Sequence, residues 1–215
     1  MKRVRIHQGQ AGFTLIELMI ATMVFSVVLL MVTFGILQIT RVYFKGVTES
    51  NTQNVARNII DTISQAIQFS GGTVVETTSG TATPSAPKAF CIGDQQFVYA
   101  LGWQLKDNSP NNTIHQSYHG LVSDTVSNCN STPAQNLDSP GISGRELLSP
   151  NMRITKLDVS QDSPGVYSVD VRVVYGDDDL LDNPTDPNAT CQGVSAGTQF
   201  CSVSELSTIV VKRVQ

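Results

Sequence analysis

Residues 12–40 read GFTLIELMIATMVFSVVLLMVTFGILQIT, and this stretch decides the architecture of the chain. From Leu18 to Thr40 it contains no Asp, Glu, Lys or Arg. As an α-helix that run spans roughly 35 Å, more than the ~30 Å hydrocarbon core of a bilayer. A cleaved secretory signal has a shorter apolar core of about 7–15 residues. A buried core helix rarely needs so long an uncharged run, so the stretch predicts one helix that can cross a membrane.

The start of this stretch carries a more specific pattern. A short basic leader, residues 1–12, precedes it, and residues 12–18 read GFTLIEL. The Gly12-Phe13 pair at the end of the leader, with Glu17 four residues after the Phe, resembles the signature of type IV prepilins. That family includes type IV pilins, minor pilins and the pseudopilins of type II secretion. A plain signal anchor is the alternative, but it gives no reason for these three residues.

The resemblance implies that residues 1–12 form a leader that is removed by prepilin peptidase. The enzyme would cut between Gly12 and Phe13 and then methylate the new amine of Phe13. Glycine suits the extended, accessible backbone that a protease needs, and it allows the enzyme to approach closely. The mature chain would begin with a transmembrane and fibre-core helix over residues 13–40.

Glu17 is the residue expected to act in assembly. A carboxylate at the edge of the hydrocarbon costs free energy, and a neighbouring cation lowers that cost. After cleavage, the amine of Phe13 is such a cation. The resemblance implies that Glu17 pairs with the amine of a neighbouring subunit and so sets the register of the fibre. The alternative is a carboxylate that simply reaches the lipid headgroups.

The helix is expected to continue beyond the membrane. Residues 42–69 contain no proline, and apolar residues recur there every four positions. These residues are Val55, Ile59, Ile63 and Ile67. The spacing predicts an amphipathic helix over residues 41–70 with one apolar stripe, and Gly71-Gly72 marks a plausible end.

Residues 71–215 are expected to form a β-rich globular head. Alternating side chains predict strands at residues 97–103, 152–159, 166–175 and 206–214. An antiparallel sheet packed on the long helix would give an α+β fold with a pilin-like layout.

All four cysteines lie in this predicted head. They form no Cys-x-x-Cys pair, which argues against a zinc site. Disulfides require an oxidising compartment, and three connectivities are open. We favour Cys191–Cys201, a tight loop before the last strand, and then Cys91–Cys129 by remainder. The resemblance implies a contact or display role for residues 191–201.

Residues 176–187 form an acidic run, GDDDLLDNPTDP. Because Ca²⁺ prefers hard oxygen ligands, Asp177, Asp179 and Asp182 are candidate calcium ligands. The spacing lacks the Gly and the terminal Glu of an EF-hand loop. A solvated acidic turn is therefore the preferred interpretation, and we expect no metal or other cofactor.

No arrangement of residues predicts an enzyme. His115 and His119 lie four residues apart, but their surroundings are not helical and lack the Glu of a zinc protease. Ser85 and Lys88 match a Ser-x-x-Lys pattern only within a proline-rich loop. The net charge of −4 argues against a general nucleic-acid binder.

The predicted function is that of a structural subunit, a minor pilin of a type IV pilus. Its partners would be prepilin peptidase, other pilins, the membrane platform of the assembly machine and a separate motor ATPase. Its head would lie outside the cytoplasm, first at the membrane and then on the surface fibre. Many major pilins carry a proline in the apolar helix, whereas residues 13–69 contain none. Two alternatives stay open: a pseudopilin in a periplasmic pseudopilus, and a membrane-tethered binding or sensing module that keeps residues 1–12.

Overall fold

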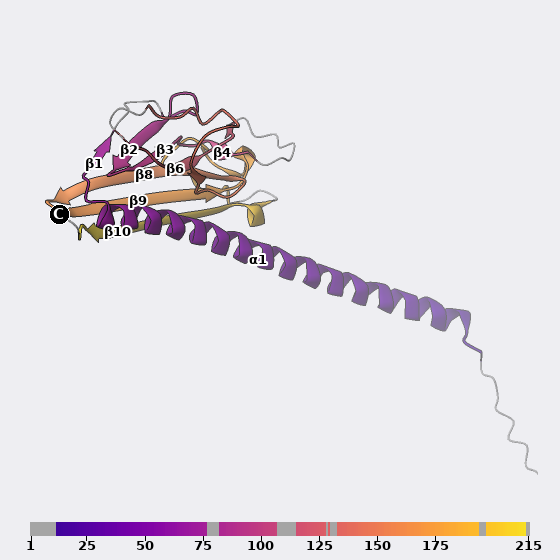
Figure 1. Ribbon diagram of the computed structural model, residues 1–215. Coiled ribbons are helices and arrows are strands. Elements are labelled where there is room, and N and C mark those ends of the chain that lie inside the picture. Colours follow the sequence, from indigo (N-terminus) through magenta and orange to yellow (C-terminus); the bar gives the residue numbers. More distant parts are fainter. Residues whose placement is uncertain are drawn as a thin grey trace, which may run out of the picture. The chain divides into compact units, whose positions relative to one another are not determined.

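The structure is a computed structural model of the chain. It describes residues 12–76, 82–106, 115–127, 129, 133–193 and 197–213. The chain divides into two compact units, residues 1–42 and 43–215. A single helix, α1, runs from Leu15 to Phe69 and contributes to both units (Figure 1).

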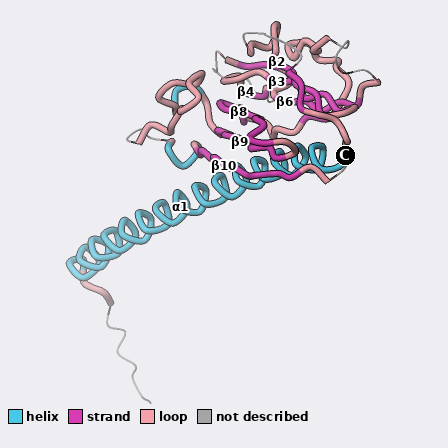
Figure 2. Tube along the Cα trace, turned by 90° about the vertical axis from the view of Figure 1, so that its left-hand side faces the viewer, coloured by secondary structure: helices cyan, strands magenta, loops and turns pink. Residues whose placement is uncertain are grey.

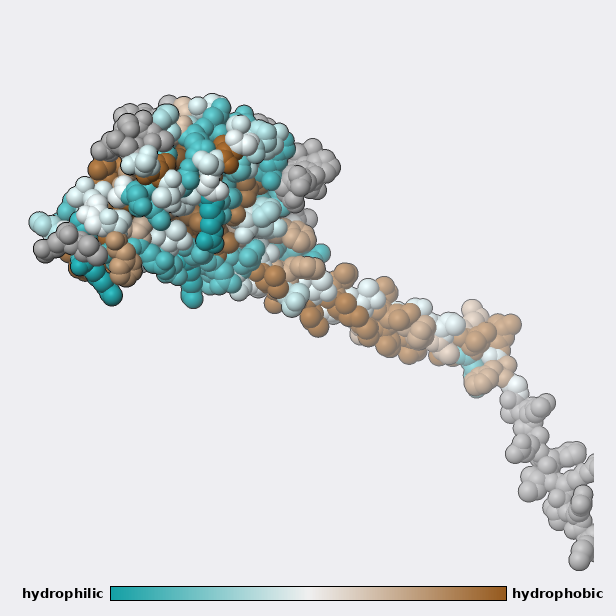
Figure 3. Space-filling model, viewed as in Figure 1, coloured by the Kyte–Doolittle hydropathy of each residue, from teal (hydrophilic) through white to brown (hydrophobic). Residues whose placement is uncertain are grey.

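In the first unit, α1 has no buried residue. Its large side chains, from Leu15 to Ile39, are all 45% exposed or more. Figure 3 shows these hydrophobic residues in brown on the surface of the helix. Such a surface is stable in lipid or against other apolar helices, but not in water. Among the described residues, α1 is the one helix long and apolar enough to cross a membrane.

In the second unit, one face of α1 is buried. Val55, Ile59, Ile63 and Ile67, the residues of the predicted apolar stripe, are between 0 and 9% exposed. The helix ends at Phe69, and Gly71 follows with φ 69°, a left-handed backbone that glycine adopts at little cost. The long helix therefore changes its surroundings along its length, as the residue pattern predicts.

A three-stranded antiparallel sheet lies beside this part of α1 (Figures 1 and 2). Its order is β10-β9-β8, with β8 at Met152–Ser163, β9 at Val166–Tyr175 and β10 at Ser202–Val211. On β9, Tyr167, Val169, Val171 and Val173 alternate into the core that also holds the α1 stripe. This alternation is what a strand with one buried face requires.

A second sheet has five strands in the order β1-β2-β3-β6-β7, all paired antiparallel. These strands are β1 Val74–Glu76, β2 Lys88–Ile92, β3 Gln95–Tyr99, β6 Leu121–Thr125 and β7 Arg145–Glu146. A short parallel pair joins β4, Gln104–Leu105, to β5, Gln116–Ser117. Side chains from both larger sheets and from α1 meet in one core. The predicted α+β, pilin-like fold is therefore confirmed, although the head contains two main sheets rather than one.

The strand predicted at residues 97–103 is shorter than expected. Strand β3 ends at Tyr99, and Trp103 packs in a separate small cluster with Val98 rather than with the main core. The cause is Gly102, which has φ 78° and donates its amide to the carbonyl of Ile154 at 2.7 Å. The chain turns there, so the side chains before and after it do not share one face.

Two hydrogen bonds attach the C-terminal strand to α1. The Nζ atom of Lys45 donates to the carbonyl oxygen of Cys201 at 2.6 Å. The amide of Arg213 donates to the carbonyl oxygen of Gln68 at 3.2 Å. Strand β10 lies between these two contacts, so it runs in the same direction as α1.

Candidate processing and assembly site

The start of α1 is closed by Thr14 and Glu17. The backbone amide and the hydroxyl of Thr14 both donate to Oε2 of Glu17, each at 2.9 Å. The amide of Glu17 donates in return to the Thr14 hydroxyl oxygen at 3.3 Å. This reciprocal arrangement is a capping box, and it satisfies amides that the first turn of a helix leaves without partners.

The sequence analysis did not predict the capping role of Thr14, because it assigned a role in this turn to Glu17 alone. The signal was present, because Thr14-Leu15-Ile16-Glu17 fits the Thr-x-x-Glu pattern that begins many helices. The box gives the Glu17 carboxylate partners within its own chain.

Gly12 and Phe13 lie just outside this capped helix. Neither residue belongs to a helix or strand, and Phe13 is 90% exposed. A Cβ atom built at Gly12 would meet no described atom within 4 Å. Packing within the described chain therefore does not require glycine here, whereas a protease that must approach this backbone closely would benefit from it. Residues 1–11 of the predicted leader lie outside the described residues.

The structure forms two disulfides in the second unit. Cys91 is bonded to Cys129 and Cys191 to Cys201, and the Cα atoms are 5.9 Å apart in both pairs. These are the pairs that the sequence analysis favoured among three connectivities. Cys201 precedes β10 directly and receives the Lys45 hydrogen bond at its carbonyl. Cys201 is therefore held both by its disulfide and by α1.

The acidic run is organised around Arg153, a residue that the sequence did not single out. Its side chain is fully buried, and Nη1 lies 2.7 Å from Oδ1 of Asp178. The guanidinium also donates to the carbonyl oxygens of Gly102 and Gly176, at 3.2 and 3.0 Å. His115 contacts the other carboxylate oxygen of Asp178, with its Nδ1 atom at 3.1 Å. One buried cation thus joins segments that are far apart in the sequence.

These contacts shift the pKa of both partners. Burial lowers the pKa of the Arg153 guanidinium, while Asp178 opposes that change. Burial alone would raise the pKa of Asp178, but the ion pair and hydrogen bond with Arg153 and the contacts of His115 lower it below its ordinary value of 3.8. Asp178 is therefore a structural anion in the folded head.

The structure places the three calcium candidates in different surroundings. Asp177 accepts a hydrogen bond from Gln104 at 3.0 Å, and Asp182 accepts one from Thr190. Asp177 and Asp179 line one open pocket of about 420 Å³, and Asp182 does not line it. Across the described residues, no group of three or more His, Cys, Asp or Glu could hold a metal ion.

The two histidines, which lie on either side of β5, bind separate carboxylates. His115 contacts Asp178, whereas Nδ1 of His119 lies 3.4 Å from Glu146. The Glu146 carboxylate also accepts the backbone amides of Gly120, Leu121 and Leu148. Burial raises the pKa of Glu146, and those amides and His119 counter the rise. Each histidine therefore contacts one carboxylate within the head, and the two do not form a shared site.

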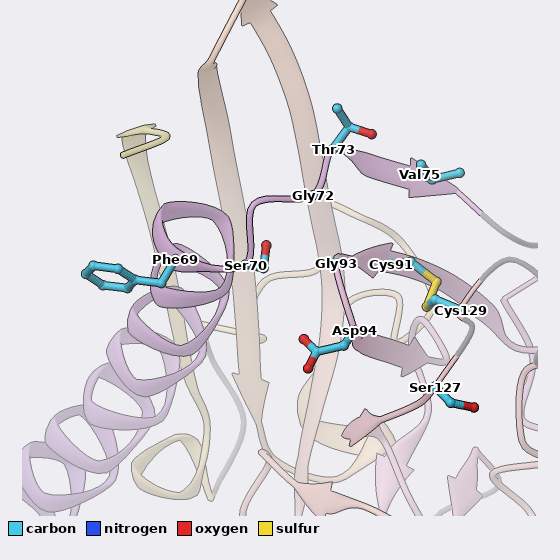
Figure 4. Close-up of a pocket in the computed structure, with 10 residues that line it drawn as sticks. All are labelled: Phe69, Ser70, Gly72, Thr73, Val75, Cys91, Gly93, Asp94, Ser127 and Cys129. Atoms are coloured by element: carbon cyan, nitrogen blue, oxygen red, sulfur yellow. A yellow bond between two sulfur atoms is a disulfide. The ribbon is translucent and has the colours of Figure 1, made fainter. Parts of the chain in front are cut away.

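A polar pocket of about 610 Å³ lies where α1 ends and β1 begins (Figure 4). The disulfide Cys91–Cys129 forms part of its wall, together with Gly72 and Gly93. Of its described lining residues, Asp94 is the one with a side chain that titrates. A single carboxylate supplies neither a nucleophile with its base nor a set of metal ligands.

Comparison with known proteins bears on the N-terminal segment. The family model of the prokaryotic N-terminal methylation motif matches residues 7–33, which include Gly12, Phe13 and Glu17. No curated protein and no solved structure matches the chain. The motif is that of a type IV pilin-like or pseudopilin precursor, and it points to a structural, non-enzymatic protein. Residues 7–33 of this chain therefore carry the type IV prepilin-like leader signature.

Proposed function

We propose that the protein is the precursor of a minor type IV pilin, a structural subunit added to a pilus filament. The observation that carries the proposal is the methylation motif at the start of a helix with no buried residue before Thr52. The chain would then have four parts. Residues 1–12 form the leader, and residues 13–40 form the membrane and fibre-core helix. Residues 41–70 continue this helix as an amphipathic segment, and residues 71–215 form the head.

The first step is processing between Gly12 and Phe13. Prepilin peptidase would remove the leader and methylate the amine of Phe13. The capping box supports this step because it starts the helix at Leu15 and leaves Gly12 and Phe13 outside it. The site is then a short exposed segment followed by a rigid helix.

The second step is assembly through the apolar helix. Burial of residues 13–40 among the same helices of other pilins removes apolar surface from contact with water or lipid. Glu17 would exchange its bonds with Thr14 for the cationic amine of an adjacent subunit, which sets the register. The Thr14 donors are neutral, whereas the amine is a cation, so the new contact adds the attraction between two opposite charges.

The proposed partners follow from these two steps. They are prepilin peptidase, other pilins that contact the N-terminal helix, and the membrane platform that feeds subunits into the fibre. The head would lie outside the cytoplasm, where both disulfides are stable.

Intact-mass analysis of the mature protein tests the processing step. We expect a chain that begins at methylated Phe13 when the host has an active prepilin peptidase. A chain that still begins at Met1 in that host would overturn the proposal and favour a membrane-tethered binding or sensing module. Shearing the cells separates the remaining options. Recovery in surface fibres supports a minor pilin, and recovery from the membrane fraction alone favours a pseudopilin.

Substitution of Glu17 tests the assembly step. Glu17→Ala should reduce incorporation into fibres while membrane insertion stays normal. Glu17→Gln keeps an acceptor for Thr14 but removes the charge, so it should fail in the same way. Glu49→Ala is the matched control, because Glu49 is an exposed residue further along α1. Unchanged fibre content in both Glu17 variants would contradict the register role.

A further inference from the structure

Exposed apolar side chains gather at one end of the second unit. Phe44 of α1 and Phe200 at the end of the short helix η2, Thr198–Phe200, have ring centroids 6.0 Å apart. Phe44 is 44% exposed and Phe200 is 46% exposed. Tyr43 and Val47 are 67% and 49% exposed. The ring centroid of Tyr43 lies 6.1 Å from that of Phe44, and Val47 lies one helical turn after both residues. We call these four residues the aromatic patch.

The aromatic patch is held in place by the surrounding structure. Phe200 is adjacent to Cys201, which is fixed by its disulfide to Cys191 and by the hydrogen bond from Lys45. Lys45 itself follows Phe44 directly on the helix. The two rings are therefore positioned on a rigid base, although each leaves nearly half of its surface exposed. A fixed patch of this kind usually marks an interaction surface.

The position of the patch along α1 indicates its partner. The uncharged run ends at Thr40, and Phe44 lies four residues later, roughly 6 Å further along the helix. The polar headgroup layer on each side of a bilayer is about 5–8 Å thick. Aromatic side chains are enriched in this layer, because one side of the layer is apolar and the other is wet. Arg41, two residues before Tyr43, is exposed and complements anionic headgroups.

We propose that the aromatic patch contacts the phospholipid headgroup layer while the protein is anchored in the membrane. Phe200, next to the disulfide-bonded Cys201, would thus contact the lipid together with Phe44. This inference rests on the proposed function only in taking residues 13–40 as inserted in the bilayer. It assigns the aromatic patch to a lipid contact, which assembly into a fibre must break.

Neighbouring charges set the depth of this contact. Phe200 lines the open pocket of about 420 Å³ together with Asp177 and Asp179. Carboxylates are costly in hydrocarbon, and they also repel anionic lipid. The rings therefore enter the headgroup layer, and the acidic residues stay on its water side.

Fluorescence quenching by lipid tests the contact in the full chain. The single tryptophan, Trp103, is replaced by Phe, and one Trp is then introduced at a chosen Phe. The protein is reconstituted in vesicles of phosphatidylethanolamine and phosphatidylglycerol that carry a bromine quencher just below the headgroups. Both disulfides are verified by mass before each measurement.

Four variants form the comparison. Phe34→Trp reports insertion of the apolar helix. Phe44→Trp and Phe200→Trp report the patch. Phe69→Trp is the matched control, because Phe69 lies on the same helix, is 59% exposed and is about 37 Å beyond Phe44.

We expect quenching of Phe44→Trp and Phe200→Trp to be at least about twice that of Phe69→Trp, as for rings in the headgroup layer. If Phe34→Trp is not quenched, the helix is not inserted, and the proposed membrane anchoring itself fails. If Phe34→Trp is quenched while Phe200→Trp matches Phe69→Trp, the lipid contact is overturned and the anchoring stands. A blue shift of Phe200→Trp that follows protein density and not quencher content would show that a second copy covers the patch, which also overturns the lipid contact.

Discussion

The ammonium group of Lys45 on α1 donates a hydrogen bond to the carbonyl oxygen of Cys201, 156 residues later in the chain, at 2.6 Å. This contact joins the long helix to the C-terminal disulfide loop and to the strand that follows it. It gives Cys201 a second attachment, in addition to its disulfide with Cys191.

Removal of this contact should loosen the C-terminal loop. Lys45→Met keeps most of the aliphatic stem and leaves a half-buried carbonyl without its charged donor, so we expect a loss of about 1–2 kcal/mol. Amide hydrogen exchange near Cys201 should become faster, because the free energy of local opening there should fall by a similar amount. Lys212→Met is the control, because Lys212 donates to the carbonyl oxygen of Gly71 at an exposed site. Equal effects of the two substitutions would contradict this role for Lys45.

Arg153 should be one of the most sensitive positions in the head. Arg153→Met leaves Asp178 without its buried cation, and we expect a loss of roughly 3–5 kcal/mol of unfolding free energy. Urea unfolding in detergent can be followed by Trp103, whose ring lies 5.4 Å from that of His115. Adding Asp178→Asn to Arg153→Met should recover part of the loss, because no unpaired charge is then buried.

Arg145 offers a matched control for this experiment. It is an exposed arginine on β7, so Arg145→Met should change stability by no more than about 0.5 kcal/mol. A loss at Arg153 as small as that at Arg145 would show that the ion pair does not hold the acidic run.

Much of this fold could be predicted, because the helix and several strands show their periodicity within short stretches of the sequence. The apolar stripe of Val55, Ile59 and Ile63 shows a helical period, and the alternation along β9 shows a strand. Arg153 could not be found in this way. It lies on β8, where Met152, Arg153, Ile154 and Thr155 are all buried, so this part of the strand is covered on both faces. Alternation alone would have placed Arg153 in water, and its pairing with Asp178 depends on a chain reversal that no spacing shows.

The lowered pKa of Asp178 predicts a defined acid response. A carboxyl group with a lowered pKa in the folded state contributes stability above its unfolded pKa and loses it as the pH falls through the folded pKa. The stability difference between wild type and Asp178→Asn should therefore be constant near neutral pH and shrink below pH 3.8. Urea titrations at a series of pH values measure it. A difference that stays constant down to pH 2 would refute the proposed anionic role.

The two disulfides should contribute unequally. By the loop-entropy account, closing a loop with a sequence separation of 38 contributes about 4 kcal/mol, and one of 10 about 3 kcal/mol. Replacing Cys91 and Cys129 by Ser should therefore lower unfolding free energy more than replacing Cys191 and Cys201. The second pair should instead show its main effect locally, as faster proteolysis near Phe200. A larger global loss from the second pair would indicate that it supports more than its own loop.

The two hydrogen bonds between α1 and the ends of β10 have a mechanical consequence. Lys45 contacts Cys201 and Gln68 contacts Arg213, so helix and strand run in the same direction between these points. The hydrogen bonds of β10 to β9 lie across the strands, so tension applied along the helix reaches this ladder as shear. Bonds loaded in shear share the force and must yield together, whereas bonds pulled apart from one end yield in turn. The head should therefore resist an axial load of the kind that the proposed fibre would transmit to it.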